Sequence, residues 1–148
     1  MFIRPYMPED WSSIERIHDS ARKTELALAG LSEAFVPLRI AAEEEELFDY
    51  PGLFVAECDG EVVGFAACTE EELAWLYVDP TRMRQGIGRA LAQYTLEQYP
   101  TISSIEALKG NEPARKLYES LGFCVSSVES GQMPGNEAFH VEVYCMKR

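Results

Sequence analysis

The sequence predicts a mixed α/β fold (α+β), in which one twisted sheet of six to seven strands is flanked by about four helices. Stretches with helical spacing of apolar residues alternate with short apolar runs. One of these runs, Leu73–Val78, is apolar at every position, which is typical of a central strand buried on both faces. The order of elements, β-α-α-β-β-β-α-β-α-β-β, places helices on both sides of the sheet. At 148 residues, we expect a single domain, residues 1–148.

The first third of the chain is predicted to hold a strand and two helices. The strand is Phe2–Arg4. Four residues recur at spacings of 3, 4 and 3 and predict an amphipathic helix with Asp10 as its cap: Trp11, Ile14, His18 and Ala21. Because His18 lies on this apolar stripe, we expect it to be packed in the core. A second helix is indicated over Leu31–Ala42 by spacings of 4, 3 and 4, and it leads into Glu43–Glu46.

The rest of the chain alternates strands with two further helices. Leu53–Cys58 and Glu61–Cys68 flank Asp59-Gly60, which predicts a β-hairpin on the N-terminal side of the central strand. After the central strand, the patterns predict a helix over Ile87–Tyr94, a strand over Ile102–Leu108, a helix over Ala114–Leu121 closed by Gly122, and two last strands, Val125–Val128 and Phe139–Met146, around the turn-rich residues 130–136.

Charge and cysteine usage disfavour several classes of protein. Thirteen Lys and Arg against 25 Asp and Glu give a net charge of −12 at pH 7, whereas general binders of nucleic acid or anionic membranes need a basic face. No apolar run has the length of a membrane span and no signal peptide is visible, so we expect a soluble, cytoplasmic protein. The four cysteines lack metal-ligand spacing, so we expect reduced, mostly buried thiols and no metal.

The loop after the central strand carries the clearest chemical signal. Asp79-Pro80 ends the strand, and Gly86 and Gly88 stand at the start of the next helix. A helix start offers unpaired N–H groups and a positive dipole end, and glycines let a phosphate approach the backbone. Three arginines add positive charge within eight positions: Arg82, Arg84 and Arg89. The pattern indicates an anion site, most simply for a pyrophosphate, although the glycines alone could equally shape a tight turn.

Three segments of the sequence together resemble the GNAT N-acetyltransferases. They are Leu76–Pro80, the Gln85–Gly88 turn, and Asn111–Phe123, which ends in Leu-Gly-Phe. The order of elements is similar to that of the family over essentially the whole chain. One position departs from the family pattern, because Met83 stands where the family usually has Arg or Gln, three residues before the first glycine. This departure leaves Arg82 or Arg84 to supply positive charge.

The resemblance implies that acetyl-CoA is the cosubstrate and that it lies between two splayed parallel strands, here 73–78 and 102–108. Its pantetheine would pair with the backbone of Leu76, Tyr77 and Val78 like an added strand. Asn111 would hydrogen-bond the pantetheine arm, and from the residues alone it is also a helix N-cap. The pyrophosphate would be held by the turn and the helix start: Arg84, Gln85, Gly86, Ile87, Gly88, Arg89 and Ala90.

Acetyl transfer to a primary amine needs a group that accepts the amine proton and one that protonates the departing thiolate. Tyr118 matches the family's tyrosine acid, although its place on an apolar helix face also suits a core aromatic. Glu106 matches the proton-accepting Glu of the ribosomal-protein N-terminal acetyltransferases. Glu72 opens the central strand and could accept the proton through a water. Each of these two carboxylates could instead be a solvated group at a strand end.

The expected function is transfer of acetyl from acetyl-CoA to a primary amine of a small, cationic molecule by direct attack. A protein N-terminal acetyltransferase of the ribosomal-protein type is one alternative, and a non-catalytic acetyl-CoA-binding regulator is another. Glu43–Glu46 either attract a cationic acceptor or form a solvated helix end. The family resemblance also allows a homodimer, for which Phe139–Met146 could supply an edge strand.

Overall fold

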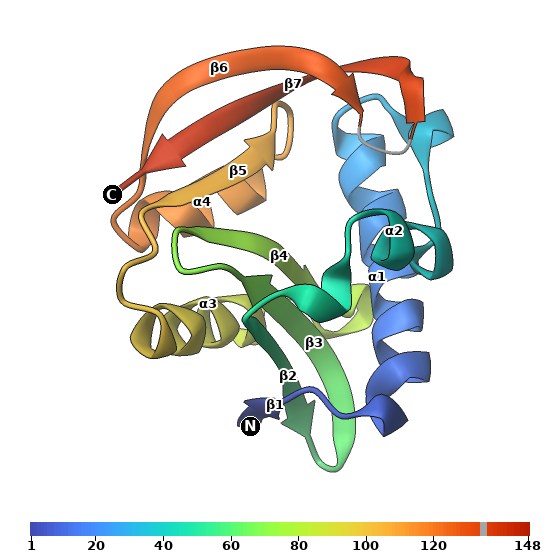
Figure 1. Ribbon diagram of the computed structural model, residues 1–148, viewed down its shortest axis with the longest axis vertical. Coiled ribbons are helices and arrows are strands. Elements are labelled where there is room, and N and C mark those ends of the chain that lie inside the picture. Colours follow the sequence, from blue (N-terminus) through green and yellow to red (C-terminus); the bar gives the residue numbers. More distant parts are fainter. Residues whose placement is uncertain (134–135) are drawn as a thin grey trace.

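The computed structural model describes residues 1–133 and 136–148 and has the expected mixed α/β fold (Figure 1). One sheet of seven strands has the order β1-β2-β3-β4-β5-β7-β6. The strands are β1 (Phe2–Pro5), β2 (Gly52–Cys58), β3 (Glu61–Cys68), β4 (Glu72–Val78), β5 (Ser104–Leu108), β6 (Cys124–Met133) and β7 (Asn136–Lys147). The α-helices of the described residues are α1 (Trp11–Leu28), α2 (Leu38–Glu44), α3 (Ile87–Gln98) and α4 (Glu112–Ser120), and short 3-10 helices include η2 (Ser32–Ala34) and η4 (Pro80–Arg82).

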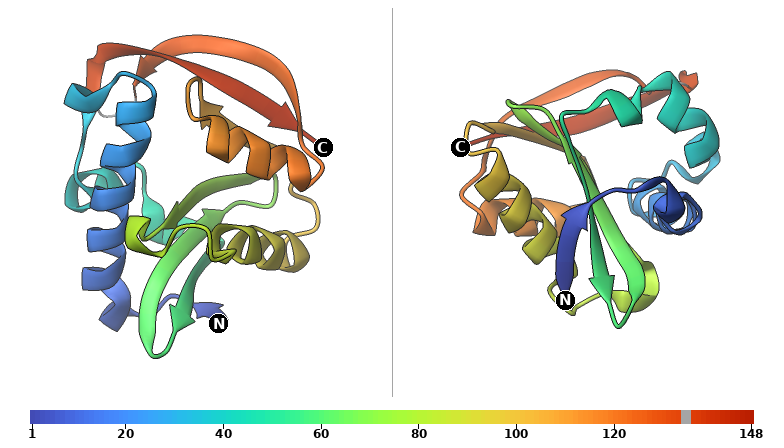
Figure 2. Two further views of the ribbon diagram at one scale, coloured as in Figure 1. Left: turned by 180° about the vertical axis from the view of Figure 1, so that it is seen from behind. Right: turned by 60° about the horizontal axis from the view of Figure 1, so that its bottom comes forward.

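Helices cover both faces of the sheet, as the order of elements predicts. Helices α1 and α2 lie on one face and α3 and α4 on the other (Figure 2). On the first face Ile14 and Ile17 of α1 pack against Phe65 and Trp75. On the second face Leu91 of α3 belongs to a separate core cluster that includes Ile105, Tyr118 and Phe123. The long β6–β7 hairpin arches over the C-terminal end of α1 (Figure 1).

Strands β4 and β5 are parallel neighbours that separate after a short contact. They pair only at Glu72 with Ser104 and at Leu73 with Ile105. On the other side of β4 the register with β3 shifts, because Trp75 pairs with Ala67 and Leu73 with Cys68, which leaves Ala74 as an extra residue. A β-bulge of this kind bends its strand and increases its twist. The bulge therefore turns β4 away from β5 and opens a split between the two parallel strands.

The expectation that Leu73–Val78 is buried on both faces holds only for the first part of β4. Leu73 and Trp75 are buried, whereas Leu76, Tyr77 and Val78 are half-buried. The difference follows from the split, because beyond the bulge one side of β4 is no longer covered by β5. Apolar residues at this end of the strand line a cavity instead of filling the core.

The predicted helix over Leu31–Ala42 is wrong in its first half. The segment begins with the 3-10 turn η2, continues in an extended conformation, and becomes helical only at Leu38. Pro37 accounts for the break, since proline lacks an N–H and its ring clashes with a preceding helical turn. The Asp19 carboxylate of α1 accepts a hydrogen bond of 2.8 Å from the Leu38 N–H and so satisfies the new helix start.

The last two strands are longer than predicted. Residues 130–133, expected to form a turn, pair with β7 from Ser130 opposite Glu142 to Met133 opposite Asn136. The remaining part of that expected turn, Pro134-Gly135, lies outside the described residues. Strand β7 lies between β5 and β6, so the edge strand at this end of the sheet is β6 and not the Phe139–Met146 strand. Nearly every residue of β6 is exposed.

Smaller expectations are partly met. His18 is 3% exposed, which confirms its place in the core. Asp10 precedes α1, but its carboxylate does not cap the helix and instead binds the Arg4 guanidinium at 2.7 and 2.9 Å. The four cysteines are free, and Cys124 is exposed, so the thiols are less buried than expected. Within residues 1–133 and 136–148, no helix combines the length and the apolar character needed to cross a membrane.

Candidate active site

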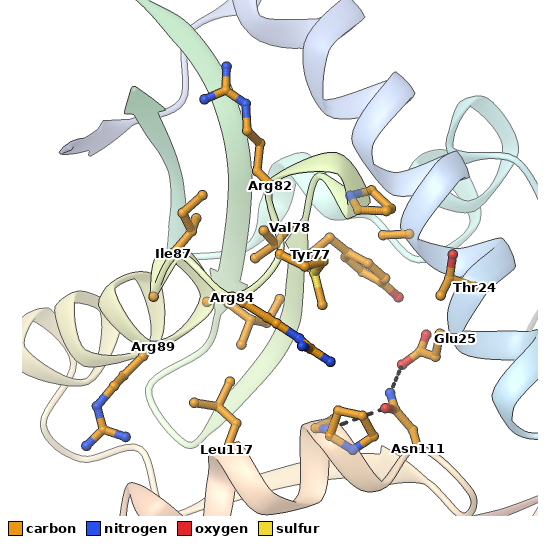
Figure 3. Close-up of a pocket in the computed structure, with 18 of the residues that line it drawn as sticks. Thr24, Glu25, Tyr77, Val78, Arg82, Arg84, Ile87, Arg89, Asn111 and Leu117 are labelled. Atoms are coloured by element: carbon orange, nitrogen blue, oxygen red, sulfur yellow. Dashed lines mark hydrogen bonds between the residues drawn. The ribbon is translucent and has the colours of Figure 1, made fainter. Parts of the chain in front are cut away.

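A cavity of about 440 Å³ lies at the end of β4, between the starts of α3 and α4 and the C-terminal half of α1 (Figure 3). Among its lining residues are nine that the sequence predicts to bind the cosubstrate: Leu76, Tyr77, Val78, Arg84, Gly86, Ile87, Gly88, Arg89 and Asn111. Gln85 and Ala90 belong to the same turn and helix start but do not line the cavity. Loops and strand ends far apart in sequence are therefore brought together as expected.

The start of α3 leaves backbone donors free for an anion. Its N-cap, Gly86, has φ 76°, a left-handed conformation that glycine adopts readily, and no side chain caps the helix. The first intrahelical bond runs from Ala90 N to Gly86 O, so the N–H groups of Ile87, Gly88 and Arg89 precede it without intrahelical partners. A Cβ at Gly88 would lie 3.5 Å from Val78 and 3.6 Å from Leu117, which is ordinary contact. Folding thus does not require a glycine there, whereas a close ligand would.

Of the three arginines around this loop, all of which line the cavity, two have side-chain partners. Arg82 donates to Glu61 at 2.8 Å, and Arg89 donates to Ser120 Oγ at 2.7 Å. Within the described part of the chain, Arg84 makes no ion pair and no side-chain hydrogen bond. Its backbone has φ 65°, and its side chain extends across the cavity toward the start of α4 (Figure 3). Arg84 is therefore the cation that faces the cavity freely.

Asp79 fixes the loop between β4 and α3. Its carboxylate accepts hydrogen bonds from the Thr81 N–H at 2.9 Å, the Thr81 hydroxyl at 2.8 Å and the Arg16 guanidinium at 2.9 Å. Burial opposes ionisation of Asp79, but the bonds from Arg16 and Thr81 outweigh it and hold its pKa below the usual value. The carboxylate therefore joins α1 to the loop that follows β4.

The depressed pKa of Asp79 predicts a loss of stability in acid. Because the folded-state pKa is lower than the unfolded one, the stabilisation is complete above the unfolded value of about 3.9 and disappears as pH falls through the folded value. We expect the free energy of unfolding, measured by urea titration from neutral pH to acid, to fall less steeply in Asp79→Asn than in the wild type. Asp49→Asn, at an exposed position, should keep the wild-type slope. Equal slopes for all three proteins would contradict the role assigned to Asp79.

A second cavity, of about 220 Å³, lies on the α1 and α2 side of the split and is also bordered by β5 and the β6–β7 hairpin. It shares four lining residues with the first cavity: Glu25, Leu76, Tyr77 and Tyr118. The two cavities therefore meet where β4 diverges from β5. Four further side chains of the second cavity are titratable: His18, Arg22, Glu45 and Glu106.

Tyr118 lies at the junction of the two cavities. It is only 7% exposed, and its hydroxyl makes no hydrogen bond to any described residue. Burial, assisted by the charge of Glu25, raises its pKa, so the hydroxyl keeps its proton at neutral and mildly alkaline pH. Tyr77 is also at the junction, and burial together with Glu25 raises its pKa in the same direction. Its hydroxyl points across the cavity toward Thr24 and Glu25 (Figure 3).

The two carboxylates expected near the chemistry are placed differently. Glu106 lines the second cavity from β5. Glu72 lines neither cavity and lies at the closed end of the split, where β4 still pairs with β5. Burial and the charge of Glu106 raise the pKa of Glu72. Among Glu43–Glu46, Glu45 alone lines the second cavity, and burial raises its pKa.

Asn111 has the predicted position and one unexpected partner. Its Oδ1 accepts a hydrogen bond of 3.4 Å from the Ala114 N–H and caps α4, as expected. Its Nδ2 donates to Glu25 Oε2 at 3.2 Å (Figure 3). Glu25 is not among the site residues predicted from the sequence, although its spacing carries a signal. Glu25 continues the apolar stripe of α1, four residues after Ala21, and a charged residue at such a position is unusual.

Residues 49–125 match the family model described as "Acetyltransferase (GNAT) domain". The chain belongs to this family. The chain is also similar to the protein named peptidyl-lysine N-acetyltransferase YiaC of Escherichia coli, with 38% identity over 71 residues. That match covers 47% of this chain and 48% of the relative, so the chain spans about half the length of the curated relative that it matches.

Solved GNAT structures share the fold over nearly the whole chain. The ribosomal-protein-alanine N-acetyltransferase of Brucella melitensis has a TM-score of 0.74 at 21% identity, with 100% of this chain and 99% of that one covered. A GNAT phosphinothricin acetyltransferase of Sinorhizobium meliloti, solved in complex with acetyl-CoA, has a TM-score of 0.72 at 19% identity, with 99% and 86% covered. At these identities the comparison shows the fold alone.

Proposed function

We propose that residues 1–148 form one N-acetyltransferase domain that transfers acetyl from acetyl-CoA to a primary amine of a small, cationic molecule. The observation that carries the proposal is the junction of two cavities of unlike charge at Tyr118. The first offers free N–H groups and Arg84 to an anion, which suits the pyrophosphate of CoA. The second has carboxylates in its wall, which suits an amine.

The residues that line the first cavity have the chemistry to hold the cosubstrate. Arg84 and the N–H groups of residues 87–89 would hold the pyrophosphate, next to Gln85 and Ala90. The free side of β4 at Leu76–Val78 would pair with pantetheine, because the divergence of β5 leaves this side of the strand open. Asn111 uses one Nδ2 hydrogen for Glu25 and keeps the other for the pantetheine arm.

The cosubstrate supplies a thioester, which the amine attacks directly. Residues of the chain accept the proton of the amine and protonate the leaving thiolate. Glu106 accepts the proton of the acceptor ammonium, directly or through a water, because it lines the acceptor cavity. Glu72 would need a longer chain of waters, since it lies off both cavities. Tyr118 protonates the departing CoA thiolate, and its raised pKa keeps it in the protonated form that this role requires.

Release of CoA with a panel of amines tests the proposal. The panel contains polyamines, amino acids, an aminoglycoside, and peptides with a free N-terminus or a lysine. We expect turnover with small cationic amines. Tight calorimetric binding of acetyl-CoA without turnover of any amine would contradict an enzymatic role and favour an acetyl-CoA-binding regulator.

Acetylation of a protein amine is the second candidate. It is supported by the similarity to a protein named as a peptidyl-lysine N-acetyltransferase and by a structural neighbour named as a ribosomal-protein-alanine N-acetyltransferase. A cavity of about 220 Å³ has room for one side chain or one N-terminal residue. Peptides that are turned over with far higher kcat/KM than any small amine would establish this alternative.

Removal of the Arg84 side chain should weaken cosubstrate binding only by removing a contact with the phosphates. We expect Arg84→Ala to bind CoA about 10-fold or more weakly, because a charge-assisted contact contributes about 1.5–3 kcal/mol. Binding of pantetheine, which has no pyrophosphate, should not change. Arg39→Ala is the matched control, since Arg39 is exposed on α2 and lines neither cavity. Calorimetry with both ligands gives the answer, and equal losses for CoA and pantetheine would remove Arg84 from the phosphate site.

A further inference from the structure

We propose that Glu25 binds the ammonium group of the acceptor and holds it beside Tyr118 and the cosubstrate. The inference rests on the proposed function and adds the residue that recognises the acceptor. Glu25 lies on α1 and lines both cavities, whereas Glu45 and Glu106 line only the second. It is thus the carboxylate at the point where an amine coming from the second cavity would meet a thioester in the first.

The bonds of Glu25 fix its carboxylate at this junction. Oε1 accepts a hydrogen bond from Arg22, one turn earlier on α1, and Oε2 accepts the bond of 3.2 Å from Asn111. The side chain is 22% exposed, so it is held in place while part of its surface faces the cavity. A carboxylate has about four lone-pair sites, so two bonds leave capacity for an ammonium.

Glu25 lies next to Tyr118, the residue that we assign as the proton donor. Glu25 and Tyr118 both line both cavities, and the negative charge of Glu25 raises the pKa of the Tyr118 and Tyr77 hydroxyls. The Tyr77 hydroxyl also points toward Glu25 (Figure 3). An ammonium bound at Glu25 would therefore lie close to the hydroxyl that protonates the leaving group. Once Glu106, in the wall of the second cavity, has accepted its proton, the neutral amine can attack the thioester from this position.

The other charges of the second cavity favour a cation over an anion. Among the described residues, Arg22 is the one guanidinium in its lining, and it already donates to Glu25. Burial lowers the pKa of His18, so this side chain is uncharged at neutral pH. Three carboxylates therefore face one positive charge: Glu25, Glu45 and Glu106. A carboxylate on the acceptor would be repelled, whereas a second positive charge would be stabilised.

The bond to Asn111 links acceptor binding to the cosubstrate site. Asn111 caps α4, the helix that carries Tyr118, and lines the first cavity. Its Nδ2 is held by the same carboxylate that we assign to the acceptor. Glu25→Gln keeps an acceptor oxygen for Asn111 but removes the charge, whereas Glu25→Ala removes both. The two variants therefore separate recognition of the ammonium from support of Asn111.

Two primary amines that differ in charge at neutral pH test the inference. Putrescine is a dication, and trifluoroethylamine is uncharged because fluorine lowers its basicity. We expect Glu25→Gln to raise the KM of putrescine about 10-fold or more, which corresponds to about 1.4 kcal/mol, with the KM of trifluoroethylamine and kcat near wild type. Glu15→Gln, the same change elsewhere on α1 and outside both cavities, should leave both constants unchanged.

Calorimetry on the complex with CoA makes the test independent of turnover. Putrescine should bind the CoA complex of Glu25→Gln at least about 10-fold more weakly than that of the wild type. CoA itself should bind equally to wild type and Glu25→Gln, and more weakly to Glu25→Ala. Equal affinity of wild type and Glu25→Gln for putrescine would overturn the assignment of Glu25. A wild type that binds putrescine through Glu25 but acetylates no amine would overturn the proposed function and leave the assignment standing.

Discussion

Tyr118→Phe should lower kcat by about 10²–10⁴-fold, which is the usual contribution of a positioned general acid. The change removes only the hydroxyl, which makes no hydrogen bond within the described residues, and leaves the ring that packs in the core beside Leu91 and Phe123. The free energy of unfolding and the affinity for CoA should therefore stay near the wild-type values. A loss confined to kcat would identify the hydroxyl as a group that acts in the transition state.

Two other tyrosines provide matched controls for this substitution. Tyr94 lies on α3 outside both cavities, so Tyr94→Phe should keep the wild-type kcat. Tyr77 lines the same junction, so Tyr77→Phe decides whether either hydroxyl can serve as the acid. Single-turnover and steady-state CoA release should be measured for all three variants. A Tyr118→Phe enzyme with unchanged kcat would remove Tyr118 from the acid role, and a larger loss in Tyr77→Phe would assign that role to Tyr77.

The pH profile gives independent information on the acid. Burial raises the pKa of Tyr118, so its protonated form persists to higher pH than in a free tyrosine, whose pKa is about 10. The alkaline limb of kcat should therefore lie above about pH 10 or outside the stable range of the enzyme. A limb near neutrality that disappears in Tyr118→Phe would contradict the burial of this hydroxyl in the working enzyme.

Helices and strands with a strong apolar periodicity could be predicted from the sequence. Those whose bounds depend on a single proline or on pairing with a distant strand could not. The apolar stripe of α1 and the apolar run of β4 predict a helix and a strand reliably, because several residues in each follow the same periodicity. The helical spacing over residues 31–42 is genuine, yet the single ring of Pro37 prevents the helix from forming before Leu38. Residues 130–133 have turn-forming composition, but pairing with β7 holds them in a strand.

In the candidate site, too, local sequence patterns could be predicted, whereas contacts between distant segments could not. The glycine turn and the Asn111–Phe123 segment are local patterns, and they indicate the first cavity from the sequence alone. The second cavity depends on the bulge at Ala74 and on the arch of the β6–β7 hairpin, which join segments far apart in sequence. Glu25 could have been suspected from its place on an apolar stripe, but its bond to Asn111 spans 86 positions and follows only from the fold.

Gly110→Ala should lower the free energy of unfolding by about 2–4 kcal/mol, as the sum of backbone strain and a forced contact. Gly110 has φ 106°, and an added Cβ would lie 3.0 Å from the carbonyl oxygen of Leu28 and 3.1 Å from the Cα of Ala29. Both neighbours are backbone atoms at the end of α1, so they cannot rotate away as a flexible side chain would. Urea unfolding measures the change.

Two glycines separate the contributions to this loss. Gly30 also has a positive φ, 72°, but an added Cβ would have no neighbour within 4 Å, so Gly30→Ala reports backbone strain alone. Gly131 has open space as well and no positive φ, so Gly131→Ala should be close to neutral. A Gly110→Ala variant no less stable than Gly30→Ala would show that the backbone at the end of α1 does not pack tightly against Gly110.

The close approach at Gly110 also has a consequence for activity. It sets the distance between the end of α1, which carries Glu25, and the start of α4, which carries Asn111 and Tyr118. A methyl group at position 110 would push these helix ends apart and lengthen the bond between Asn111 and Glu25. We therefore expect Gly110→Ala to lower kcat/KM at temperatures where it is still fully folded, and Gly30→Ala to leave it unchanged. Equal activity in both variants would mean that the junction of the two cavities does not depend on this contact.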